Sequence, residues 1–222
     1  ARELRSLLKA RQALEKARKA QSNSIRGLLR AQGIRLGKVS EGQFADAVMV
    51  LVNREVPGLA EAFAGMLQVW ALAKAEAARL EKLVQQRSRA DEVTRRFEQV
   101  YGVGPLTSLL YRATLDNPHR FRRTEEVADY LGLAPRVYQS GDMAYRGRIT
   151  KEGDHLLRWH LVECAHVLLT KGRDCTLKRW GLELAHRKGS AKAKVAVARK
   201  LAVLLWRLWK EEKDFEPFPQ AA

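Results

Sequence analysis

The segment from Arg136 to Lys151 holds the residues of this chain that are best suited to phosphate chemistry. Ser140 is followed by Gly141, so its hydroxyl has little steric cover and can attack a phosphodiester in line. Basic side chains flank this serine, and such groups can hold the non-bridging oxygens while charge develops. They are Arg136, Arg146, Arg148 and Lys151. The pattern fits a nucleophile for phosphoryl transfer. It also fits an ordinary turn serine, because Ser-Gly is common in turns and no general base stands close in sequence.

A second candidate phosphate site is the segment from Tyr101 to Thr107. Gly102 and Gly104 permit a tight turn and a close approach to a nucleic-acid strand, and a helix is expected from Pro105. The free N–H groups of that helix would point at a phosphate, as in a helix-hairpin-helix module, and the contact would be independent of base sequence. The alternative is a glycine-proline turn that only starts a helix.

Other polar residues give weaker predictions. We expect Arg158, Lys192 and Lys194 to contact the backbone of DNA or RNA. The spacing of His155, His160 and His166 scatters these side chains around one predicted helix, so no metal site is expected from them. The acidic residues near position 150 could bind magnesium, but neighbouring cations and a capping role explain them better. They are Asp142, Glu152 and Asp154.

Composition excludes several classes of protein. The 222 residues are 46% hydrophobic and 30% charged, so the chain has enough apolar residues to form a core. No uncharged apolar run is long enough to span a bilayer, and no secretory segment opens the chain. Cys164 and Cys175 match no zinc spacing and predict reduced thiols. We therefore expect a folded protein of the cytoplasm with no membrane partner.

The formal net charge of +16 favours a polyanionic partner. The charge gathers in two regions. Residues 1–40 hold eleven basic and two acidic side chains, and residues 136–210 hold seventeen basic and six acidic ones. The sequence predicts two basic surfaces with a mildly acidic region between them.

The first part of the chain, residues 1–98, is predicted to form a long antiparallel helical hairpin of the coiled-coil type. Leucines from Leu4 to Leu29 recur at helical spacing, and a second stripe runs from Leu59 to Val84 at near-heptad spacing. A short helix is expected at 41–54. The end of the second stripe that holds Phe63, Met66 and Trp70 has few expected partners, so we predict a dimer or higher oligomer through this hairpin.

Residues 99–222 differ in sequence pattern from residues 1–98, because their predicted elements are shorter and they contain more glycine. A domain boundary is therefore expected near 91–99. Helices are predicted at 105–115, 124–131, 153–169, 174–187 and 191–209, and residues 136–150 favour a hairpin or an ordered loop. The predicted fold is mainly α. The long helical hairpin is followed by a small helical domain with a helix-hairpin-helix-like element and a short active-site hairpin.

Several motifs in fixed order resemble the C-terminal domain of transposases of insertion sequence family 110, with its 116 and 902 relatives. The resemblance runs from about Asp91 to Trp209, and the preceding helical hairpin resembles the coiled-coil segment of that family. The motifs are Gly102-Val103-Gly104-Pro105, Asp116-Asn117-Pro118-His119-Arg120-Phe121, Tyr130-Leu131-Gly132-Leu133-Ala134-Pro135-Arg136, Gln139-Ser140-Gly141, Gly147-Arg148-Ile149-Thr150-Lys151, Leu156-Leu157-Arg158 and Val197-Ala198-Arg199-Lys200-Leu201.

The resemblance implies a multimeric DNA recombinase guided by a structured bridge RNA. In that family an N-terminal domain with an acidic tetrad binds magnesium, and a serine of the C-terminal domain links covalently to DNA. Ser140 stands at the position of that serine. The chain starts at Ala1 within the coiled-coil region, so the expectation is a fragment or a truncated gene that needs the acidic domain for cleavage and binds no cofactor itself.

The leading prediction is therefore a transposase fragment that binds DNA and guide RNA and supplies Ser140 as the nucleophile. Its expected partners are DNA, a structured guide RNA and further copies of the chain, as a dimer or tetramer. Two alternatives stay open from the sequence. One is a nucleic-acid-binding module without chemistry, and the other is an assembly unit whose helical hairpin pairs protomers.

Overall fold

The computed structural model describes residues 2–140 and 143–219, and the side chains of Val137, Gln139, Ser140 and residues 143–146 lie outside that description. The fold is mainly helical, which confirms the predicted class. Two compact units are present, one formed by Ser6–Leu83 and the other by Ala1–Arg5 with Val84–Ala222. In the described part of the chain, none of the helices has the length and hydropathy that a membrane crossing requires.

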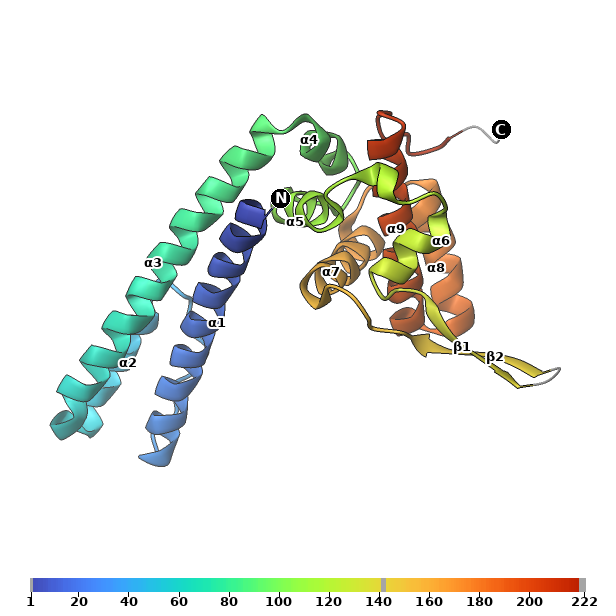
Figure 1. Cartoon of the computed structure of the whole chain (residues 1–222). Helices are drawn as coiled ribbons and strands as arrows, with labels where there is room; N and C mark the ends of the chain where they lie inside the picture. Colours follow the sequence, from blue (N-terminus) through green and yellow to red (C-terminus); the bar gives the residue numbers. More distant parts are fainter. Residues whose placement is uncertain (1, 141–142, 220–222) are drawn as a thin grey trace. The chain divides into compact units, whose positions relative to one another are not determined.

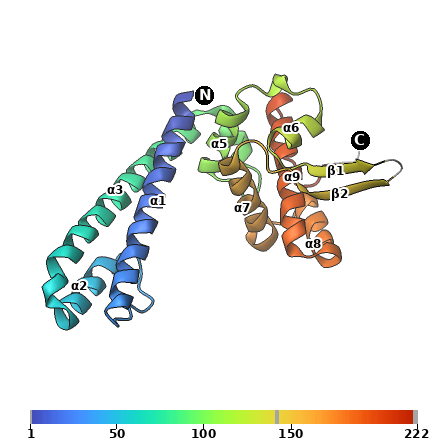
Figure 2. The same cartoon turned by 60° about the horizontal axis from the view of Figure 1, so that its bottom comes forward.

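The helical unit Ser6–Leu83 is built from two long helices and a short one. α1 (Arg2–Ala31) and α3 (Ala60–Ala90) lie side by side in both views, and α2 (Phe44–Glu55) packs near the turn end of the pair (Figures 1 and 2). The 3-10 turn η1 (Pro57–Leu59) connects α2 to α3. Gln21 of α1 donates from Nε2 to the carbonyl oxygen of Met66 at 3.3 Å, and Arg11 pairs with Glu81. These contacts fit the predicted antiparallel pairing.

The aromatic end of α3 is covered, which corrects the reasoning behind the expected oligomer. Phe63 and Trp70 are 2% and 5% exposed and belong to one apolar cluster with residues of α1 and α2. The ring of Phe44 in α2 lies 5.0 Å from that of Trp70. The short helix α2 supplies this cover, and the spacing of its apolar residues does not show which end of α3 it packs on. The exposed apolar residues of α3 are instead Val69 and Leu72.

The second unit packs helices around α9. Its helices are α4 (Glu92–Glu98), α5 (Pro105–Leu115), α6 (Thr124–Tyr130), α7 (His155–Lys171), α8 (Thr176–Lys188) and α9 (Ser190–Lys210), with the 3-10 turn η2 (Pro118–Arg120). α9 packs against α4, α6, α7, α8 and η2, and it contributes fully buried apolar side chains to the core: Val197, Ala198, Leu201, Ala202 and Leu205. Trp206 donates from its indole N–H to the carbonyl oxygen of Pro118 at 2.8 Å. α6 precedes the hairpin and α7 follows it, and both pack on α9. The core of this unit therefore fixes the two ends of the segment that holds the hairpin.

That hairpin consists of β1 (Pro135–Ser140) and β2 (Met143–Ile149), paired antiparallel. It is the sheet of the described residues and extends away from the helices of its unit in both orientations (Figures 1 and 2). The sequence predicted a hairpin or an ordered loop here, and the structure contains the hairpin.

Candidate nucleic-acid interface

Ser140 is the last residue of β1. Tyr138 lies opposite Tyr145, and Ser140 lies opposite Met143. The register shifts between Pro135 and Val137, where Arg136 faces the two residues Gly147 and Arg148. Such a bulge bends the strand and redirects side chains. The side chain of Ser140 is outside the described residues, so its predicted role rests on its backbone position.

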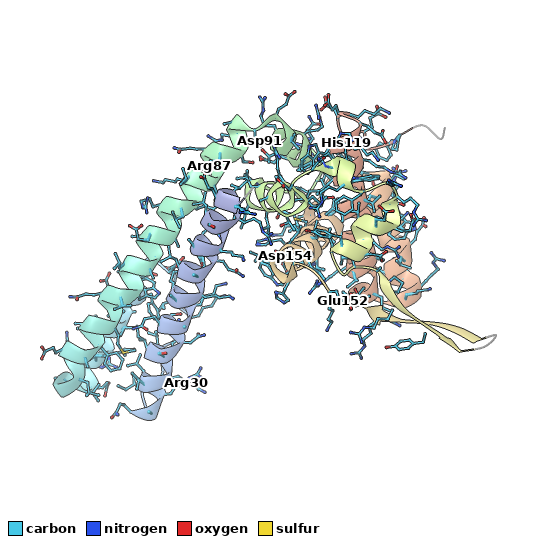
Figure 3. All side chains as sticks on the ribbon, in the orientation of Figure 1. Arg30, Arg87, Asp91, His119, Glu152 and Asp154 are labelled. Carbon is cyan, nitrogen blue, oxygen red and sulfur yellow. The ribbon has the colours of Figure 1, made fainter. Side chains whose placement is uncertain are left out.

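The base of the hairpin is held by two glycines in close contact with the opposite segment. Gly132 has φ of +64°, and a Cβ atom there would lie 1.9 Å from the carbonyl oxygen of Glu152. Gly153 has φ of +80°, and its Cβ would lie 2.1 Å from the carbonyl oxygen of Tyr130. Glu152 is labelled in Figure 3, together with Asp154, between β2 and α7. No larger residue fits either position, so the chain entering the hairpin is packed directly on the chain leaving it.

Arg158 forms hydrogen bonds to both of these segments. Its side chain is 7% exposed, and Nη1 donates to the carbonyl oxygens of Leu131 at 3.1 Å and Glu152 at 2.9 Å. Two backbone hydrogen bonds add to this, from Thr150 to Ala134 and from Lys151 to Gly132. We expected Arg158 to contact nucleic acid, whereas the structure gives its guanidinium a buried, positioning role at the base of the hairpin.

Three of the predicted phosphate contacts gather at this base. Arg136, Arg148 and Lys151 are exposed, and Arg136 donates from Nη2 to the carbonyl oxygen of Thr150 at 3.3 Å. Four residues of extended strand separate Arg136 from Ser140, which is about 13 Å at 3.3 Å per residue. The side chain of Arg146 is outside the described residues. The described cations therefore suit a stretch of backbone beside the hairpin base, at some distance from Ser140.

The segment from Gly102 to Thr107 packs against α7. Gly102 has φ of +89°, and a Cβ there would lie 2.7 Å from the carbonyl oxygen of Cys164. The Thr107 hydroxyl is buried and accepts a hydrogen bond from the Cys164 thiol at 3.4 Å. Burial raises the pKa of this thiol above its usual range. Gly102 and Thr107 thus serve helix packing here, whereas Gly104 has open space beside its Cα atom.

The remaining candidates lie on α7 and α9. Lys192 is exposed and Lys194 half-buried in the first turns of α9. Asp154 caps α7 by accepting a hydrogen bond from the backbone N–H of Leu157 at 2.9 Å, which agrees with the expected capping role. Within the described residues, no group of three His, Cys, Asp or Glu side chains is arranged to hold a metal ion. Both cysteines are free and buried.

Sequence reasoning missed the pairing of Gly132 with Glu152 and of Gly153 with Tyr130. Both glycines were visible as turn signals. The sequence does not show that two segments about twenty residues apart lie in direct contact. It also does not show that Arg158 forms hydrogen bonds to both segments. A buried arginine among apolar residues of a helix is the one signal that could have suggested this role.

Comparison with known proteins gives a family match that covers the hairpin and its base. Residues 94–180, which include the hairpin, its glycine-lined base and α7, match the family described as "Transposase IS116/IS110/IS902 family". These residues are therefore similar to the transposase domain of that family. The domain starts in α4 and ends in α8, so the helical unit Ser6–Leu83 and α9 lie outside the matched residues.

Curated relatives extend the similarity of the transposase domain to most of the chain. The chain is 30% identical over 219 residues to "Transposase for insertion sequence element IS1111A" of Coxiella burnetii, covering 96% of this chain and 60% of that protein. It is 30% identical over 223 residues to "Probable family 20 transposase" of Pseudomonas aeruginosa, covering 96% and 65%. The chain thus spans less than two thirds of the length of these relatives.

Proposed function

We propose that this chain is the DNA-binding and strand-transfer part of a transposase, with the β1–β2 hairpin as the element that meets the DNA. The observation that supports this most directly is the construction of the hairpin. The two-stranded ribbon has a base that is fixed by Gly132, Gly153 and Arg158. Three exposed cations lie beside this base: Arg136, Arg148 and Lys151. A ribbon with a fixed base and cations beside that base is suited to hold a phosphate backbone in one position.

Ser140 is the proposed nucleophile. Its Oγ attacks the phosphorus of a DNA phosphodiester, so that an Oγ–P bond forms and the bond from phosphorus to one sugar oxygen breaks. The hydroxyl proton leaves to solvent or to a base, and the released sugar oxygen takes up a proton. A hydroxyl of a second DNA strand then attacks the same phosphorus and loses its proton. The new O–P bond forms while the Oγ–P bond breaks, and Oγ takes up a proton, which completes strand transfer. Arg136, Arg146, Arg148 and Lys151 hold the surrounding phosphates, and Gly104, Lys192 and Lys194 add backbone contacts.

Other partners belong to the same proposal. A structured guide RNA would bind the basic surfaces, and further copies of the chain would assemble through the helical unit, in the cytoplasm. Magnesium is expected in the acidic domain of the family.

A covalent-adduct assay tests this function. The chain is joined to the part of the relatives that it does not span and is incubated with labelled DNA, guide RNA and magnesium, then run on a denaturing gel. The unchanged protein should carry DNA through the denaturing step, and Ser140→Ala should lose the adduct while its affinity for DNA changes little. One uncharged hydroxyl contributes little to binding beside several cations.

Ser140→Cys is the matched variant, because sulfur can still attack phosphorus poorly. A trace of adduct with cysteine and none with alanine supports the role of the Oγ atom. An adduct that persists in Ser140→Ala would move the nucleophile elsewhere, with Tyr138 and Thr150 as the next residues to examine. DNA binding with no adduct in the unchanged protein would favour the alternative of a binding module without chemistry.

A further inference from the structure

A groove of about 720 Å³ opens between α8, α9 and the C-terminal segment after α9. Its apolar lining includes Trp180 and Leu177 of α8 and Val203 and Leu204 of α9. The groove lies mostly outside residues 94–180, and the hairpin contributes no residue to it. It is therefore a separate feature of the second unit that the proposed strand-transfer role does not use.

The charged residues that line this groove are mainly cationic. Arg199, Lys200 and Arg207 of α9 contribute three positive charges, and Glu216 contributes one negative charge. The Nζ atom of Lys200 lies over the Trp180 ring, 4.0 Å from its centroid. An aromatic ring on an apolar floor, with cations beside it, matches an unpaired nucleotide, whose base is flat and apolar on its faces and whose phosphate is an anion.

The outer wall of the groove is held in place by the rest of the unit. The carbonyl oxygen of Pro217 accepts a hydrogen bond from the backbone N–H of Thr176 at 3.0 Å. The side chain of Gln99 accepts a hydrogen bond from the backbone N–H of Phe215 at 2.9 Å. The guanidinium of Arg179 lies 4.9 Å from the centroid of the Phe218 ring. These contacts hold the C-terminal segment in place, so binding would not have to order this segment first.

We propose that this groove binds an unpaired segment of nucleic acid, with a base against Trp180 and phosphates at Arg199, Lys200 and Arg207. Bases inside a duplex present only their edges to a protein, so the groove selects single strands or extruded nucleotides. Charge decides against an apolar peptide as the occupant, since such a peptide would not offset the excess of positive charge in the lining. The proposal does not depend on Ser140 or on the chemistry of the hairpin.

Equilibrium binding of fluorescent oligonucleotides tests the groove. The probes are a short oligothymidylate, a short oligouridylate and a DNA duplex of mixed sequence. Trp180→Leu should weaken binding of the single strands by about 5- to 100-fold, because base–aromatic stacking contributes strongly to such complexes, and should leave duplex binding within about twofold. The two single-stranded probes show whether DNA or RNA is preferred.

Trp159→Leu is the matched control, because Trp159 is 51% exposed on α7 and is absent from the groove lining. It should leave single-strand binding unchanged, and Trp180→Phe should keep most of it. Urea unfolding checks that each variant is folded. If Trp180→Leu does not fold, exposed Lys200 is changed to glutamine, which should lower the dependence of single-strand affinity on salt.

Three results would overturn the proposal. The first is an unchanged affinity for single strands in folded Trp180→Leu. Where Trp180→Leu does not fold, the corresponding result is an unchanged salt dependence of single-strand affinity in Lys200→Gln. The second is an equal loss of duplex affinity in the same variant. The third is displacement of the probes by polyglutamate at concentrations where the oligonucleotides themselves bind, which would assign the groove to an acidic protein segment. Each of these results comes from a binding measurement and not from the adduct assay. Failure of the groove proposal can therefore be distinguished from failure of the strand-transfer proposal.

Discussion

At the scale of residues, the cations and the serine of the hairpin have different positions and so different expected effects. Arg136, Arg148 and Lys151 lie at the base, whereas Ser140 is the last residue of β1. A separation of about 13 Å exceeds the reach of a direct contact with one phosphate. The described cations are therefore suited to place the DNA backbone, and the charge that develops at the attacked phosphate needs other groups.

Replacing Arg136 or Arg148 by alanine should weaken duplex binding by about 1–3 kcal/mol, because each change removes a charge-assisted phosphate contact. The slope of log affinity against log salt should fall by about one unit for each arginine. Fluorescence anisotropy over a range of salt concentrations measures both quantities.

Lys213→Ala is the control for loss of one positive charge, since Lys213 is exposed after α9 and pairs with Glu211 at 3.1 Å. It should change affinity by much less than the arginine variants. Equal losses in all three variants would mean that the hairpin makes no particular contact and that total charge alone attracts DNA.

At the scale of elements, the close crossing of the two segments below the hairpin should be sensitive to any added atom. Gly132→Ala places a methyl group against the Glu152 carbonyl in a backbone region that alanine avoids. We expect the free energy of unfolding to fall by roughly 3 kcal/mol. Chemical denaturation followed by circular dichroism measures the change.

Gly104→Ala is the comparison within the same unit. Gly104 has extended backbone angles and nothing within 4 Å of a Cβ position, so the stability cost should stay below about 1 kcal/mol. If the two alanine variants unfold at the same denaturant concentration, the close packing at the base of the hairpin is absent in solution.

Local sequence patterns predicted the elements well, because their causes are local. The helix predicted at 105–115 coincides with α5, where Pro105 occupies the first turn and Gly104 precedes it. Residues 136–150 favour a hairpin or an ordered loop, and β1 and β2 pair there as antiparallel strands. The burial of Thr107, the bonds of Arg158 and the cover over Trp70 depend on which helices pack together. Those contacts are set by tertiary structure and carry no short-range signal.

At the scale of the whole molecule, the basic residues are distributed over both units. The formal charge of +16 predicts that affinity for duplex DNA and for structured RNA falls steeply as salt increases, with little dependence on base sequence. Titrations between about 50 and 200 mM salt measure this dependence. An affinity that stays constant over that range would contradict a polyanionic partner.

Assembly is a second property of the whole molecule. Val69 and Leu72 lie one turn apart on α3 and are 57% and 65% exposed, so a second copy of the chain could cover them. We expect a dimer or higher oligomer by light scattering at high micromolar concentration, and we expect Leu72→Glu to shift the mass toward the monomer. Val50→Glu on α2 is the control, since Val50 is 63% exposed on another helix. A monomer for the unchanged chain would refute this prediction.

The most direct measurement of the central claim is the identity of the residue that becomes linked to DNA. The trapped adduct is digested with nuclease and trypsin, and the modified peptide is sequenced by mass spectrometry. Cleavage after Arg136 and Arg146 releases the peptide 137–146, which contains both Ser140 and Tyr138. We predict a nucleotide on Ser140 in this peptide. A nucleotide on Tyr138, on Thr150 or on any peptide outside the hairpin would contradict the assignment of Ser140 as the nucleophile.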